Sequence, residues 1–376
     1  MKIIKLSISL TIICLLIVCT NSCKNKSAET PEQDKKNTTI VLNEKSATDF
    51  AHQIENSLIN GEPSFLNNAF DRPSIKKIIS ANSIVASAFD TEAGQAAFDN
   101  NFKYGDFTVN TINDGGDFRF IRYYEENGKH HIVFRTYIDF GLKIDDYMLG
   151  LNEKNEIKIV DGYSYNMSAT FSEIVKYDML YYALRNTDIQ SEAHLISTAD
   201  SLLNTKQYKP LIRFLNEHKT ELNKYPYYNY FYINALNETS TDFIRDLDQL
   251  QVEGIDERCT LLHKILYYTN KGEADKVEET IQKIINYSGE DPIYWFFYGK
   301  ACANAGNYQD ALRAYANSEK AMPMIWDLWK GKLYCFYQLN EKENFFQCLD
   351  LAKDTYSMTN DELNNIVRKE FSKMKR

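Results

Sequence analysis

The sequence predicts an α+β domain, with helices packed on one face of a curved antiparallel sheet, followed by an all-α domain of helical repeats. Three observations predict this order. Residues of the C-terminal half recur every 34 positions, strand-like runs fill much of 107–165, and an apolar leader opens the chain. We therefore expect four segments: a leader (1–22), a flexible tether (23–44), the α+β domain (45–170) and the helical repeats (175–376).

The first 23 residues predict export from the cytoplasm. Two lysines precede an apolar stretch over 6–19, which is too short to span a bilayer comfortably. The sequence becomes abruptly polar after Cys23, and it resembles a bacterial lipoprotein signal. The resemblance implies lipidation of Cys23 and a membrane-anchored protein of the cell envelope. Lipidation at Cys19, an uncleaved anchor and an ordinary secretory signal remain alternatives.

The tether and the overall charge narrow the class of partner. The segment Ser27–Asn43 is too polar to build a core, so we expect it to be a flexible spacer between the lipid and a folded body. The chain has a formal net charge of −9, and the leader carries lysines but no acid. The mature chain is therefore still more acidic, which argues against nucleic acid as a partner.

The cysteines beyond Cys23 predict neither a metal site nor a cofactor. They form no CxxC pair, and no histidine stands at zinc-ligand spacing from them. We expect buried apolar thiols, although an oxidising compartment would permit one disulfide. These cysteines are Cys259, Cys302, Cys335 and Cys348.

The segment 45–170 reads as helices followed by strands, which is the order of an α+β domain with helices packed on a sheet face. Predicted helices cover 49–60, 64–70, 75–81 and 92–102. Predicted strands cover 107–112, 118–124, 131–138, 146–151 and 157–165, with turn residues at 113–116, 126–128 and 152–155.

The strand sequences Ile132–Tyr137, Asp145–Leu149 and Ile157–Tyr163 resemble the last strands of the nuclear transport factor 2-like (SnoaL-like) cone fold. That fold curls its sheet around a pocket, and in enzymes of the family a pocket carboxylate moves a proton. The resemblance implies a candidate pocket formed by Arg135, Tyr137, Tyr147 and Asp161.

The residues themselves favour a structural role for this candidate pocket. Asp161 precedes Gly162, and we expect it to be a carboxylate at the end of a strand that pairs with Arg135. We therefore expect no catalysis by this residue. Binding of a small ligand remains an alternative. His130 and His131 would face opposite sides of a strand, so we expect a solvated turn and no metal there.

The 34-residue period is clearest in the unit Pro292–Met324. Gly299 and Ala311 are small enough for two helices to approach closely, Gly306 suits a left-handed turn, and Pro323 cannot continue a helix. The unit resembles the tetratricopeptide repeat (TPR) family. Within this unit the resemblance rests on Trp295, Gly299, Gly306, Tyr308, Ala311, Tyr315 and Pro323. In the neighbouring units Trp329 and Gly272 keep the 34-residue period, and Asn340 takes the place of a turn glycine.

This resemblance implies four to five helix pairs and a terminal capping helix over 360–373. It also implies a scaffold with a curved surface that binds a protein or peptide partner. We expect Trp295 and Trp329 to lie in the core between helices. The tyrosine-rich run 224–232 provides a candidate partner surface, Tyr225, Tyr228 and Tyr232, or else a repeat helix packed on both sides.

Taken together, the sequence predicts a lipid-anchored envelope lipoprotein that acts as a protein-binding scaffold and is not an enzyme. One alternative is a small-ligand-binding or enzymatic N-terminal domain that the repeats support. A second alternative is a glycan-binding lipoprotein of the SusD-like kind, which also uses helical repeats.

Overall fold

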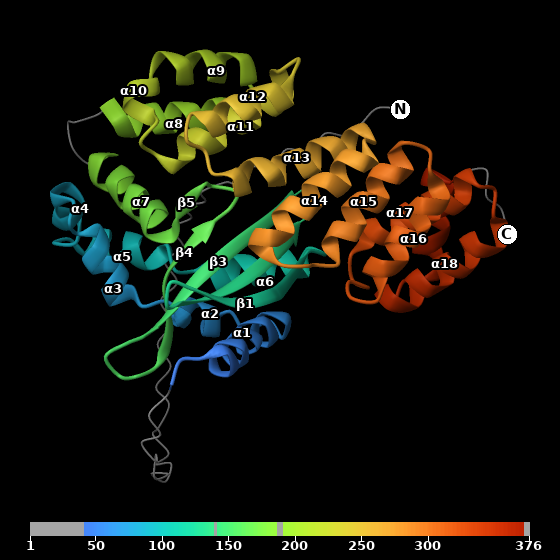
Figure 1. Ribbon diagram of the computed structural model, residues 1–376, viewed down its shortest axis with the longest axis horizontal. Helices are drawn as coiled ribbons and strands as arrows, with labels where there is room; N and C mark the ends of the chain where they lie inside the picture. Colours follow the sequence, from blue (N-terminus) through green and yellow to red (C-terminus); the bar gives the residue numbers. More distant parts are fainter. Residues whose placement is uncertain (1–40, 139–140, 186–190, 372–376) are drawn as a thin grey trace, which may run out of the picture.

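The computed structural model describes residues 41–138, 141–185 and 191–371. The predictions on the leader, on Cys23 and on most of the tether therefore lie outside the described residues. Within the described residues, an antiparallel five-stranded sheet at 117–170 follows a group of helices and precedes a longer series of helices (Figure 1). The predicted order, α+β and then all-α, is confirmed.

Four of the six helices that the structure describes before the sheet begin at polar side chains that cap them. Asn43, Asp71, Asn82 and Thr91 each accept a hydrogen bond from a backbone N–H of the helix that follows. These helices are α1 (Glu44–Ile59), α2 (Ser64–Ala69), α3 (Arg72–Ile79), α4 (Ser83–Ala88), α5 (Glu92–Asn100) and α6 (Tyr104–Asn113).

One predicted strand was wrong. Residues 107–112 belong to helix α6, because Gly105, Thr108 and Thr111 are buried at helical spacing on one face. The turn at 113–116 therefore joins a helix to the first strand and does not form a hairpin. Helix α4 was not predicted.

The sheet is a simple meander in which each strand pairs with the next. Asn127 and Gly128 connect β1 to β2 with φ angles of 52° and 72°, as a type I′ hairpin turn requires. The strands are β1 (Asp117–Glu126), β2 (Lys129–Ile138), β3 (Gly141–Leu151), β4 (Ile157–Ser164) and β5 (Ala169–Thr170).

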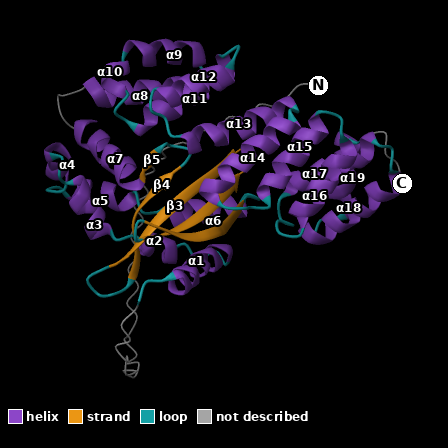
Figure 2. Ribbon diagram, viewed as in Figure 1, coloured by secondary structure: helices purple, strands orange, loops and turns teal. Residues whose placement is uncertain are grey.

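Both faces of the sheet are covered, so β2 is buried without a break from residue 132 to 137 (Figure 2). On one face, Ile132, Phe134 and Tyr147 belong to a core shared with the N-terminal helices and α7. On the other face, Val133 and Tyr137 belong to a core shared with the C-terminal helices. The expectation that helices cover only one face was wrong, because the helical part packs back onto the sheet.

The helical part keeps the 34-residue period. Helices α14, α16 and α18 begin at Ala274, Tyr308 and Lys342, and the turns before them contain Gly272, Gly306 and Asn340 with φ angles of 73°, 86° and 57°. These left-handed turn residues are as predicted.

The helices are α7 (Phe171–Arg185), α8 (Ser191–Asn204), α9 (Tyr208–Glu217), α10 (Lys219–Leu222), α11 (Pro226–Thr239), α12 (Phe243–Val252), α13 (Glu257–Lys271), α14 (Ala274–Ser288), α15 (Ile293–Asn304), α16 (Tyr308–Glu319), α17 (Trp326–Gln338), α18 (Lys342–Tyr356) and α19 (Asn360–Glu370).

Beyond α7, the helical part forms three groups. Helices α8 to α12 lie together beyond α7, α13 to α15 lie along the sheet, and α16 to α19 extend away from it (Figures 1 and 2). A capping box between Thr359 and Glu362 begins α19, which matches the predicted terminal helix as far as residue 370.

Candidate functional site

A cavity of about 70 Å³ lies where α7, α8 and α11 meet. Its wall is mostly aromatic and aliphatic, with two carboxylates, and the exposed Ser197 lies at its rim. Apolar walls with a few converging polar groups are typical of ligand sites, but this cavity is smaller than the roughly 300–1,000 Å³ of most of them. The lining residues are Asp178, Tyr181, Ile196, Ser197, Asp200, Leu203, Asn204, Tyr227, Tyr230 and Phe231.

The two carboxylates of this cavity, Asp178 and Asp200, are held by neutral donors. The hydroxyl of Tyr227 donates to Asp178 Oδ1 at 2.5 Å, and the side-chain amide of Asn204 donates to Asp200 Oδ2 at 3.0 Å. Burial raises the pKa of Asp178 from 3.8 to about 6, although the bond from Tyr227 lowers it. Burial also raises the pKa of Asp200.

Neither acid was predicted as a site residue from the sequence. Asp178 lies between Tyr177 and Met179 of α7, a helix that also carries Glu173, Lys176 and Arg185, so its position in the chain gave no signal. Asp200 lies on a different helix, and only the packing of α7 against α8 brings the two together.

The four residues of the predicted N-terminal pocket do not surround one cavity. Tyr147 packs against Phe70 on the face that carries the N-terminal helices, with ring centroids 5.8 Å apart. Tyr137 packs on the opposite face against Phe296 of α15, at 5.5 Å. They are separated because strand residues alternate between faces and adjacent strands keep a fixed register.

Asp161 and Arg135 are not partners, contrary to the prediction. Asp161 accepts hydrogen bonds from the backbone N–H and the hydroxyl of Ser172, at 2.9 and 2.7 Å, near the start of α7. Arg135 instead contacts Asp117 of β1 at 2.5 Å and Asp291, between α14 and α15, at 2.9 Å. Burial alone lowers the pKa of Arg135, but Asp291 and Asp117 outweigh it and raise the pKa.

Further contacts join the sheet to the helical part. Arg122 of β1 donates to the carbonyls of Asn286 and Tyr287 at the end of α14. The guanidinium of Arg258 lies 3.7 Å from the ring centre of Tyr163. The α+β and helical segments are therefore packed together rather than linked only by the chain.

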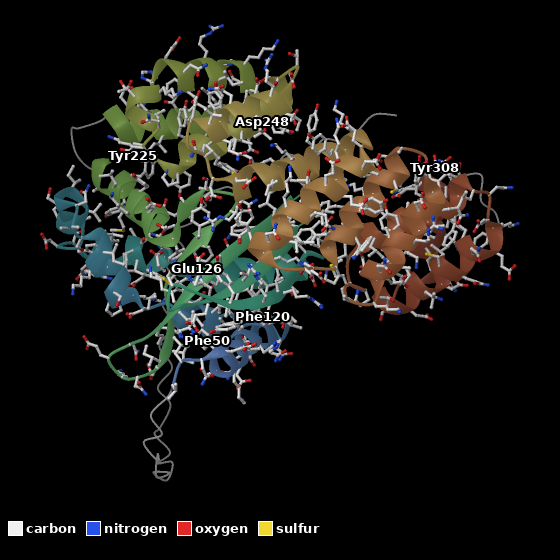
Figure 3. The ribbon with its side chains drawn as sticks, in the orientation of Figure 1. Phe50, Phe120, Glu126, Tyr225, Asp248 and Tyr308 are labelled. Atoms are coloured by element: carbon white, nitrogen blue, oxygen red, sulfur yellow. The ribbon has the colours of Figure 1, made fainter. Side chains whose placement is uncertain are left out.

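The tyrosines of the predicted partner surface are mostly buried. Tyr225 and Tyr228 are 1% and 6% exposed, and Tyr225, which is labelled in Figure 3, packs against Tyr177 of α7. Tyr232 is half-buried and donates its hydroxyl hydrogen to Asn216. The alternative prediction, a helix packed on both sides, describes α11 better, because α11 contacts α7, α8, α9 and α12.

The two repeat tryptophans differ in burial. Trp329 is 3% exposed and donates to the carbonyl of Pro323 at 2.7 Å, so its predicted core position is confirmed. Trp295 is 48% exposed, and the prediction that it lies in the core was wrong. The sheet covers the side of α15 that carries Phe296, whereas Trp295 lies on another side, against Tyr298.

The remaining repeat positions pack as their residue types suggest. Gly299 faces Tyr315, and a Cβ added to Gly299 would lie 2.9 Å from that ring. Ala311 is fully buried between the helices, and Tyr308 packs edge-on against Tyr334. All four cysteines beyond the tether are free and buried, as predicted.

His130 and His131 do not form a solvated turn. His130 lies 2.8 Å from the hydroxyl of Tyr123, and His131 lies 2.9 Å from Asp146, which also accepts a hydrogen bond from Tyr124. Asp146 is 2% exposed, so this network stiffens the junction of the first three strands.

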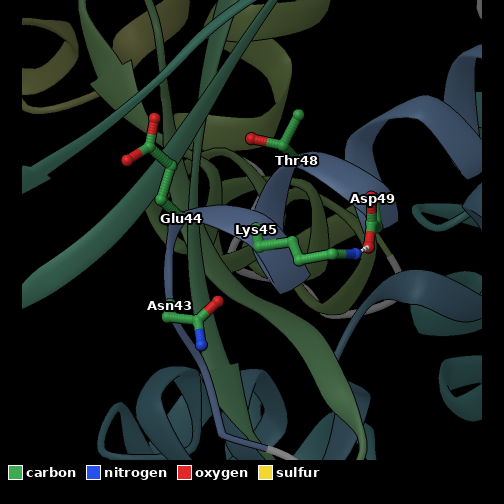
Figure 4. A pocket seen from close by; sticks show the side chains of 5 residues that line it. All are labelled: Asn43, Glu44, Lys45, Thr48 and Asp49. Atoms are coloured by element: carbon green, nitrogen blue, oxygen red, sulfur yellow. Dashed lines mark hydrogen bonds and ion pairs between the residues drawn. The ribbon is translucent and has the colours of Figure 1, made fainter.

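A second hollow lies at the start of α1 and is shallow (Figure 4). Its only ion pair, between Lys45 and Asp49 at 2.5 Å, is largely exposed and adds little stability. We assign no site there.

Comparison with models of protein families, with curated proteins and with solved structures gives no match for this chain. Among the described residues, no group of three or more histidines, cysteines or acids is arranged to hold a metal ion. No helix in the described part of the chain is both long and apolar enough to cross a membrane.

Proposed function

We propose that this protein is a lipid-anchored lipoprotein of the bacterial cell envelope whose helical part binds a protein or peptide partner. The helical part is proposed to be built of repeats of the tetratricopeptide type, and the role involves binding without a catalytic step. The exposure of Trp295 on this part carries the proposal, because tryptophan and tyrosine are enriched where proteins bind each other.

The packing of the sheet limits where a partner would bind. The side of α15 that carries Phe296 and Phe297 is occupied by Tyr137. A partner therefore contacts sides of the helices that face away from the sheet. Trp295 and Tyr298 form an edge-on aromatic pair on such a side, and Met324, which is 52% exposed, lies at the end of the same unit.

A photo-crosslinking amino acid at position 295 tests the partner surface in living cells. The matched control places it at Leu351, which is 55% exposed on α18. We expect a discrete crosslinked species from position 295 only. No species at position 295, or the same species from both positions, would contradict the proposal.

The anchor is tested by metabolic labelling with a radioactive fatty acid. Cys23→Ser is expected to abolish labelling and to release the protein from membranes, whereas Cys19→Ser, the matched control within the leader, is expected to retain both. Full labelling of Cys23→Ser would refute the anchor at this residue, and loss of labelling in Cys19→Ser alone would move it to Cys19.

A further inference from the structure

We propose that the cavity between α7, α8 and α11 binds the ammonium group of a small alkylamine. This site is separate from the proposed partner surface around Trp295, and it does not depend on it. Its walls combine two carboxylates, Asp178 and Asp200, with the rings of Tyr181, Tyr227 and Tyr230.

The charge of the cavity selects a cation. No lysine or arginine of the described residues forms an ion pair with Asp178 or Asp200, and their side-chain partners are Tyr227 and Asn204. A carboxylate held only by neutral donors retains lone pairs for a positively charged ligand. Asp178 and Asp200 are both part-buried, and an incoming ammonium group would supply the opposite charge that no lysine or arginine of the described residues provides.

The aromatic wall selects an organic cation over a hydrated metal ion. Tyr227 and Phe231 stack at 6.2 Å, and Tyr230 packs against the same Phe231 ring at 5.9 Å. Ring faces attract ammonium groups, and the apolar surface of Ile196 and Leu203 suits a short hydrocarbon chain. Three or more protein ligands for a metal are not grouped anywhere in the described chain.

The volume limits the size of the bound group. An apolar cavity of roughly 150 Å³ holds benzene, so the 70 Å³ here accommodates roughly three heavy atoms. Ethylammonium has this size, and a longer amine would extend past Ser197 at the rim. The best small ligands gain a limited free energy per atom, so ethylammonium is expected to bind with a Kd on the order of 1 mM.

Binding is expected to depend on pH. The ionisable groups around Asp178 and the cavity are Tyr181 from α7, Tyr227 and Tyr230 from α11, Asp200 from α8 and Tyr104 from α6. The pKa of Asp178 is about 6, so its charge is largely present only above that pH. Affinity for ethylammonium should therefore rise between pH 5 and pH 7.

A ligand-observed NMR titration of the full chain tests the site, with ethylammonium chloride as the probe and ethanol as its neutral match. We expect saturable binding of ethylammonium, no saturable binding of ethanol, and affinity about tenfold weaker in Asp178→Asn. Asp275→Asn, an exposed carboxylate on α14, is the matched control and should bind as the wild type does.

Several outcomes would overturn the inference. These are equal binding of ethanol, unchanged affinity in both Asp178→Asn and Asp200→Asn, or no pH dependence. If Asp178→Asn does not fold, Asp200→Asn carries the test. Binding of a lysine-containing peptide without binding of ethylammonium would likewise refute a free alkylamine as the occupant.

Discussion

Arg135 links the sheet to the helical part through a buried ion pair, and Arg135→Met tests this link. The side chain is fully buried, and it reaches Asp117 on the neighbouring strand and Asp291 before α15. Methionine retains most of the apolar volume and removes the charge. Two carboxylates, one of them only 1% exposed, are then left without their cation.

The expected loss follows from that burial. Removing one member of a buried ion pair costs about 3–5 kcal/mol, because the remaining charge stays in a medium of low polarity. Asp291 keeps a backbone hydrogen bond from Ile293 at 2.7 Å, and Asp117 is partly exposed, so we expect the lower part of this range. The double variant Arg135→Met/Asp291→Asn also neutralises the carboxylate that has lost its cation. It should regain part of the lost stability, with a coupling energy between the two substitutions of about 1–3 kcal/mol.

Urea unfolding followed by circular dichroism measures both quantities. Arg245→Met is the matched control, since Arg245 is 73% exposed on α12 and should change stability by less than about 0.5 kcal/mol. The reasoning is refuted if Arg135→Met unfolds within about 1 kcal/mol of the wild type. It is equally refuted if the two substitutions are additive.

Three further predictions concern single positions. Gly299→Val should lower stability by about 1–3 kcal/mol in thermal unfolding, because even a Cβ would lie 2.9 Å from the ring of Tyr315; a neutral effect would contradict this packing. Asn340→Ala should cost about 1 kcal/mol and Asn340→Gly should not, because φ is 57° there; equal losses in urea unfolding would contradict the left-handed turn. The folded state holds the Asp178 proton more tightly than the unfolded state, since the pKa rises from 3.8 to about 6, so this group lowers stability as pH rises through that window. Asp178→Asn should therefore gain stability relative to the wild type between pH 4 and pH 7, by up to about 3 kcal/mol, and parallel pH–stability curves would contradict this.

Several features could be predicted from the sequence because they depend on local chemistry. Gly272, Gly306 and Asn340 occupy left-handed turns, since glycine and asparagine tolerate that conformation best. Asn127-Gly128 forms the predicted hairpin turn for the same reason. The strand-like run 107–112 was wrongly predicted as a strand, because its β-branched residues Thr108 and Thr111 also fit the buried side of α6.

The candidate site was not predictable in the same way. Asp178, Asp200 and Tyr227 lie on three helices, and no spacing in the chain shows that they converge. The tyrosine run was predicted to be either a partner surface or a helix packed on both sides, and the sequence did not decide between the two. Tyr225 and Tyr228 are buried because α11 packs against other helices on several sides, which a single helix pattern does not reveal.

By itself, the sequence determined the order of the two folded parts, the 34-residue period and the burial of the cysteines. These features follow from residue type and from the periodicity of apolar residues, which can be recognised within short segments of the chain. Only the tertiary structure decided that the helical part covers the second face of the sheet. That packing pairs Arg135 with Asp291, places Tyr137 against Phe296 and leaves Trp295 exposed. These outcomes depend on contacts between residues about 160 positions apart, and the free energy of such contacts is set by which surfaces meet, which the local sequence does not specify.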